Sequence, residues 1–189
     1  MADKRFLAAF LTPPHVPIEG YRLYPFCLKY RLWLEAIESP FMSDDSKLTV
    51  PDLMIAMRIC SETRGGWLGW RERWVAFRLS QDQERFETAC KAFVGYMDGG
   101  ETWPRFYDKK DRDGGGGSTV PWQLYVLCNL IRHGISYENA LQMPEGRAIW
   151  LSTGFALSDG AKVEVLTTED EELIDSLQKE RTQSNEPAA

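Results

Sequence analysis

The side chains best suited to catalysis are two histidines, and their positions argue against it. A serine or cysteine nucleophile usually takes a histidine as its base. His15 lies in a proline-rich stretch, and His133 stands where a predicted helix ends. The dipole of that helix is by itself a sufficient reason for a histidine at position 133. Neither histidine therefore indicates a catalytic base.

The cysteines are far apart in the sequence. Intervals of about thirty residues or more separate Cys27, Cys60, Cys90 and Cys128, and no pair has the short spacing of a zinc site. Each lies in an apolar run, where free cysteines usually pack as small core residues. We therefore expect buried, reduced cysteines, without a metal or a disulfide framework, as in proteins of the cytoplasm.

Motifs for phosphates and cations are incomplete. The glycine run at residues 114–117 lacks the Lys-Ser/Thr of a phosphate-binding loop, and no dinucleotide fingerprint occurs. Residues 111–114 share a pattern with a calcium loop, but Lys109 and Val120 stand where that loop needs acids. The sequence thus predicts no cofactor and no enzyme. A pocket that gathers carboxylates with strongly shifted pKa values is the alternative left open.

The charge balance argues against a nucleic-acid partner. The 189 residues carry a formal net charge of −6 at pH 7, whereas nucleic-acid binders usually present a basic face. The apolar run near the N-terminus is too short for a signal peptide, and no stretch approaches the ~18 apolar residues of a membrane span. We expect a soluble protein that binds neither nucleic acid nor membrane.

Aromatic residues are abundant, with seven tryptophans, seven tyrosines and nine phenylalanines. Four of them recur at spacings of three and four, which places them on one helical face: Trp67, Trp70, Trp74 and Phe77. Core packing is the favoured interpretation of this stripe, and a partner groove is the alternative. The candidate partner-binding residues are Trp67, Trp70, Trp74, Trp122 and Trp150, although Trp150 could equally lock its helix onto the core.

The overall pattern predicts a mainly α protein, a compact multi-helix domain with a short N-terminal extended or hairpin segment. Residues 5–11 and 20–24 are expected to be extended and to pair, since the prolines between them forbid a helix. We assign residues 1–24 to this extended segment, 25–181 to the helical domain and 182–189 to a disordered tail.

Capping residues mark the helices. Helices are predicted to follow Pro25, Thr49, Ser80 (in a capping box with Gln83), Pro121, Ser136 and Pro144, and a box of Thr168 with Glu171 opens a late acidic helix. Gly134 and Gly160 end two of them, because glycine readily adopts the left-handed turn. Residues 98–118 are expected to form a long flexible loop, and residues 163–166 an extended or irregular segment.

Two stretches resemble a known family. Residues 22–26 (RLYPF) and 34–41 (LEAIESPF) are similar to the R-L-x-P-F … L-L-E-A-I-x-S-P-F start of small phage and prophage proteins from tail gene clusters. Residues 134–144 (GISYENALQMP) are similar to their G-x-S-x-x-x-A-L-x-M-P helical turn. These proteins are tail assembly chaperones of long-tailed phages, encoded just before the tape measure protein. The resemblance covers roughly residues 20–62 and 119–180.

The resemblance implies a non-enzymatic chaperone in the host cytoplasm. It would bind the long, apolar-rich tape measure protein, keep it soluble, and hand it over as subunits of the tail tube protein polymerise around it. Binding an amphipathic helix needs apolar and aromatic anchors rather than catalytic groups, which agrees with the composition. The alternative is a permanent structural component of the particle, such as a head-to-tail connector or tail completion protein.

Overall fold

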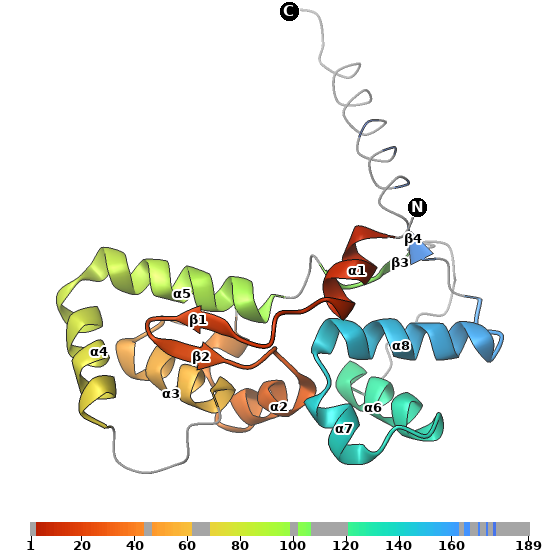
Figure 1. Ribbon diagram of the computed structural model, residues 1–189, viewed down its shortest axis with the longest axis horizontal. Coiled ribbons are helices and arrows are strands. Elements are labelled where there is room, and N and C mark those ends of the chain that lie inside the picture. The colour runs from red at the N-terminus through yellow and green to blue at the C-terminus, as the bar shows by residue number, and fades with distance from the viewer. Residues whose placement is uncertain are drawn as a thin grey trace, which may run out of the picture.

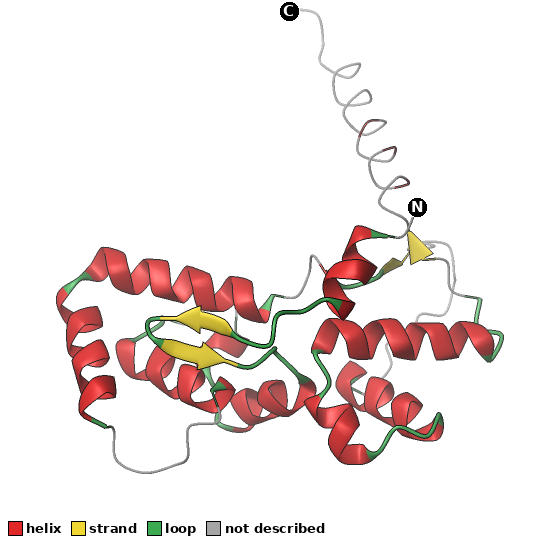
Figure 2. Cartoon of the chain, in the orientation of Figure 1, coloured by secondary structure: helices red, strands yellow, loops and turns green. Residues whose placement is uncertain are grey.

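The computed structural model describes residues 3–43, 47–61, 69–98, 102–106, 121–162, 165, 166, 170, 173 and 176. These residues form eight α-helices, one 3-10 turn (Pro40–Met42) and two pairs of short antiparallel strands, so the prediction of a mainly α fold with a small N-terminal hairpin is confirmed (Figures 1 and 2). Two hydrophobic cores divide the molecule into two lobes. Helix α2 (Leu28–Ala36) joins them, because Leu28 belongs to one core and Leu34 to the other.

The first lobe packs α3 (Val50–Cys60), α4 (Trp70–Gln81) and α5 (Gln83–Met97) with the hairpin. As predicted, Thr49 caps α3, in a box with Asp52. The cap predicted for α5 was wrong: Asp82, and not Ser80, accepts a hydrogen bond from a backbone N–H of the first turn. The core of this lobe contains Leu23, Leu34, Leu53, Met57, Cys60, Leu79 and Phe93.

The N-terminal segment is helical in its first half, contrary to the expectation. Helix α1 (Lys4–Phe10) occupies most of residues 5–11, because Asp3 caps it and leucine, alanine and arginine favour a helix. The hairpin instead pairs β1 (Val16–Ile18) with β2 (Tyr21–Leu23). Its two turn residues, Glu19 and Gly20, have φ values of 48° and 83°, as a type I′ turn requires.

The second lobe contains α6 (Trp122–Arg132), α7 (Tyr137–Gln142) and α8 (Glu145–Ser158), and α1 packs on α8 (Figure 1). Ser136 caps α7, and glycines with φ near +88° follow α6 and α8, as predicted. Strand β3 (Arg105–Phe106) pairs with β4 (Val165–Leu166), so these last two residues are extended, one of the two alternatives predicted for them. The prediction of a loop over residues 98–118 was wrong for Arg105 and Phe106, because this pairing makes them a strand. The core of this lobe consists of Leu28, Val126, Leu127, Leu130, Ala140, Ala148 and Ile149.

The two lobes meet at the start of α8. The backbone N–H of Glu145 donates to the carbonyl of Phe26 over 2.8 Å, and its carboxylate accepts two hydrogen bonds from Arg31 of α2, at 2.5 and 2.8 Å. Gly146 is needed here, because a Cβ at this position would clash with the side chain of Thr102. The junction therefore contains an ion pair and one close approach of the backbone to Thr102.

Several predictions lie outside the described residues. They concern Trp67, most of the loop at residues 98–118, the capping box of Thr168, and the tail at residues 182–189. Residues 170, 173 and 176 of the predicted late helix are helical. Within the described residues, every helix is too short or too polar to cross a membrane.

Candidate partner-binding surfaces

The two histidines make structural contacts. The ring of His133 stacks on Phe155 at 4.1 Å, and its Nδ1 lies 2.9 Å from the carbonyl oxygen of Asn129. The ring of His15 contacts Tyr24 edge-on. Over the part of the chain that the structure describes, no three histidine, cysteine or acidic side chains are grouped as metal ligands.

Three of the four cysteines are buried, as predicted, and burial raises their pKa values: to about 11 for Cys27 and Cys90 and to about 12 for Cys60. The expectation was wrong for Cys128, which is exposed. It lies on α6 four residues after Leu124, which is also exposed, so this line along the helix faces solvent.

Helix α4 exposes its aromatic residues. We define the α4 stripe as Trp70, Trp74 and Phe77, whose side chains are 75%, 56% and 55% exposed. The interpretation of the stripe as core packing was therefore wrong for these three residues. Helices α3 and α5 cover the opposite face of α4, where Leu79 is the buried residue of the helix. The periodicity places the rings on one face but does not determine which face is covered.

Each ring of the α4 stripe has a contact on the surface of the helix. Trp74 and Phe77 stack with their centroids 5.9 Å apart and their planes 27° from parallel. The guanidinium of Arg71 lies 5.5 Å from the ring centroid of Trp70. With Arg73, the stripe lines a shallow hollow of about 540 Å³. A stripe of this kind can accept apolar side chains from a partner.

A second apolar surface lies between α6 and α8. We define the α6–α8 groove as the hollow of about 440 Å³ lined by Trp103, Pro104, Trp122, Tyr125, Val126, Ile149, Ser152, Thr153 and Ala156. The ring centroids of Trp103 and Trp122 are 5.4 Å apart. The guanidinium of Arg31 lies over the Trp122 ring, 5.5 Å from its centroid. Trp122 is 36% exposed and Tyr125 is 58% exposed. The groove is therefore aromatic on one side and small and aliphatic on the other.

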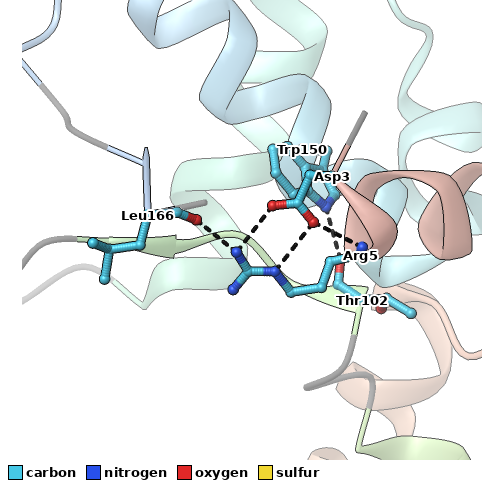
Figure 3. A network of polar contacts seen from close by, with 5 residues as sticks. All are labelled: Asp3, Arg5, Thr102, Trp150 and Leu166. Atoms are coloured by element: carbon cyan, nitrogen blue, oxygen red, sulfur yellow. Dashed lines mark hydrogen bonds and ion pairs between the residues drawn. The ribbon is translucent and has the colours of Figure 1, made fainter. Parts of the chain in front are cut away.

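Trp150 lies in neither surface, and its contacts favour the structural alternative. Its indole N–H donates to the carbonyl of Thr102 over 2.7 Å, and Phe6 of α1 meets it edge-on at 5.6 Å. Figure 3 shows this bond beside the network in which Arg5 donates to Asp3 and to the carbonyl of Leu166. Trp150 thus connects α8 to Thr102 by a hydrogen bond and to α1 by a ring contact.

The structure therefore separates the predicted residues. Trp70 and Trp74 share the α4 stripe, Trp122 lines the groove, and Trp67 lies outside the described residues. Two aromatic residues of the groove were missed. Tyr125 could have been found from its spacing of three after Trp122, whereas the pairing of Trp103 with Trp122 carries no local signal.

The buried carboxylate of the described residues is Glu145, 3% exposed. Burial raises its pKa, while the hydrogen bonds and charge of Arg31 oppose that shift. Glu145 borders a cavity of about 580 Å³ between the lobes, with Phe26, Tyr96 and Thr102 among the other lining residues. Both carboxylate oxygens accept hydrogen bonds from Arg31, so joining the lobes is a sufficient structural role for this shifted group.

No known family, curated protein or solved structure matches this chain.

Proposed function

We propose that this protein is a non-enzymatic chaperone of phage or prophage tail assembly, which binds apolar helical segments of the tape measure protein on the α4 stripe and in the α6–α8 groove. The exposure of the α4 stripe carries the proposal. Three large rings on one helix face solvent, and soluble proteins that leave contiguous apolar patches uncovered generally use them for binding.

The geometry of the stripe suits a helical partner. Its first and last residues are seven positions apart on α4, which corresponds to about 10 Å along the helix axis. An amphipathic helix presents its own anchors at spacings of three, four and seven residues, so its apolar face can lie along such a line. Tryptophan is favoured at binding centres because it buries a large area and has few rotatable bonds.

The choice of the tape measure protein rests on the resemblance of residues 22–41 and 134–144. These two stretches contact each other: Cys27 and Pro144 form a β-bridge, and the carbonyl of Phe26 accepts from the N–H of Glu145, the residue after the second motif. In this chain the two stretches therefore form one structural feature, the lobe junction. The same feature positions α8 and hence the groove.

Co-expression with the tape measure protein of the same genome tests the proposal. We expect a higher soluble yield of the tape measure protein and co-purification of the two chains. The variant Trp70→Ala with Trp74→Ala should lose most of both effects. Trp33→Ala is the matched control, because Trp33 is 49% exposed but lies on α2. Co-expression without any gain in solubility and without co-purification would refute the proposal.

A permanent structural component is the competing function. A connector or completion protein forms ring oligomers and stays in the particle, whereas an assembly chaperone leaves. We therefore expect mass spectrometry of purified virions to lack this chain. Its presence in stoichiometric amounts, together with rings in solution, would assign it to the particle instead.

A further inference from the structure

Arginines border the α4 stripe on both sides. Successive residues of an α-helix are rotated by about 100°, which places Arg73 on one side of the stripe and Arg71 and Arg78 on the other. All three side chains are exposed. The outer face of α4 is thus an aromatic strip between two positively charged edges.

The described residues provide few partners for these charges. The acidic residue of α4, Glu72, faces the lobe, where it accepts from Tyr21 and lies 3.5 Å from Arg58. Within the described part of the chain, Arg73 and Arg78 have no ion pair or hydrogen bond, and Arg71 contacts the ring of Trp70. The outer face of α4 therefore carries unbalanced positive charge, although the whole chain has a formal net charge of −6.

The positions of two arginines oppose the helix dipole. Arg71 and Arg73 are the second and fourth residues of α4, close to the end where the dipole favours negative charge. Arg78 stands in the last turn, where a positive charge is favourable. The dipole accounts for Arg78 but not for Arg71 or Arg73, and of these two, within the residues that the structure describes, only Arg71 has a ring contact, with Trp70.

We infer that the α4 stripe binds an acidic amphipathic helix, whose apolar strip packs on the three rings and whose flanking carboxylates pair with Arg73 on one side and with Arg71 and Arg78 on the other. This deepens the proposed function by naming the chemistry of the partner segment. The arrangement is that of two helices packed in register, in which charges beside the apolar seam select the partner.

Single-stranded nucleic acid is the other ligand that aromatic and arginine side chains can bind. The structure favours the acidic helix for two reasons. A nucleic acid is negatively charged along its whole length, so the net charge of −6 on the protein repels it. A short acidic helix on α4 contacts mainly the arginines. In addition, Trp74 and Phe77 stack on each other and so each offers only one ring face to a base.

Binding of two designed peptides to the full-length chain tests the inference. The peptides have the same length and the same leucine positions, and differ in carrying glutamate or lysine beside the leucines. We expect the glutamate peptide to bind at least about tenfold more tightly at low salt, measured by fluorescence anisotropy, with a smaller preference at high salt. The variant Arg73→Glu with Arg78→Glu should reverse the preference.

Arg22→Glu with Lys91→Glu is the matched control. It makes the same change in net charge at exposed positions of β2 and α5, and it should keep the preference for glutamate. Circular dichroism checks that both variants fold. Equal binding of the two peptides, binding of neither, or tighter binding of an oligothymidine than of the glutamate peptide would overturn the inference. If the tape measure protein still co-purifies in that case, the proposed function stands and only the selectivity fails.

Discussion

The α4 stripe and the α6–α8 groove are both rich in aromatic residues, but they differ in their relation to the core. In the stripe, Trp70 is 75% exposed, and its ring lies beside the guanidinium of Arg71. In the groove, Trp122 is 36% exposed, and the opposite wall includes Ile149 of the second core. A change in the stripe should therefore alter binding alone, whereas a change in the groove should alter binding and stability together.

The largest loss of stability is expected in the second core, which contributes Val126 and Ile149 to the groove. Leu130 is fully buried in the second core, so Leu130→Ala should lower the free energy of unfolding by about 3 kcal/mol. Leu124→Ala on the same helix is the control, because Leu124 is 48% exposed and its loss should cost under about 0.5 kcal/mol. Urea denaturation measures both. Equal losses would show that α6 is covered on both faces, and the groove would then not be a surface open to a partner.

Alkaline pH should destabilise the lobe that carries the stripe. Burial raises the pKa of Cys60 to about 12 and those of Cys27 and Cys90 to about 11, from an ordinary value of 9.0, and it also raises the pKa of Tyr96. All four residues belong to the first lobe. Because the folded pKa values of the three thiols are raised, their contribution to stability is complete below about pH 9 and is lost as the pH rises through about 11 to 12.

We expect the free energy of unfolding to fall by on the order of 2 kcal/mol between pH 8 and pH 10. Native alkylation followed by mass spectrometry gives an independent measurement. Iodoacetamide should modify the exposed Cys128 first, while the three buried thiols react after unfolding. A stability that does not change with pH, or equal reactivity of the four thiols in the native protein, would contradict the burial of the three cysteines.

Removing the ion pair at the junction between the lobes should lower the stability more than removing an exposed ion pair. Glu145→Gln removes the charge that pairs with Arg31, whose side chain is 18% exposed. We expect a loss of about 1.5 kcal/mol, below the value for a fully buried pair because water reaches Arg31. Asp159→Asn, which removes the exposed charge beside Arg132 and His133, should cost less than about 1 kcal/mol. Equal losses in thermal unfolding would mean that the junction ion pair is solvated.

The features that the sequence predicted correctly depend on neighbours within a few residues. Thr49 and Ser136 bond to backbone or side-chain groups three positions away, and Gly134 ends α6 through its own φ. The helix at residues 5–11 was missed although its cap, Asp3, was present. A single acidic cap before a short apolar run is compatible with a strand, and packing on α8 adds the stability that such a short helix lacks.

The candidate surfaces depend on contacts between distant residues. A period of three and four places the rings of α4 on one face, but the packing of α3 and α5 decides that this face is left uncovered. The groove forms because Trp103, from a stretch expected to be a loop, meets Trp122. Such a contact cannot be inferred from one sequence, since neither residue has a periodic relation to the other.

The most direct test of the comparison replaces one tryptophan on each surface. Trp122→Ala should lower the free energy of unfolding by about 1 kcal/mol, because it removes the contacts with Trp103 and with the guanidinium of Arg31. Trp74→Ala should change it by less than about 0.5 kcal/mol, since the side chain is 56% exposed. Both variants should retain less of the tape measure protein in a pull-down. If Trp74→Ala destabilises the fold as much as Trp122→Ala does, the α4 stripe serves the first lobe, and its exposure no longer argues for a partner.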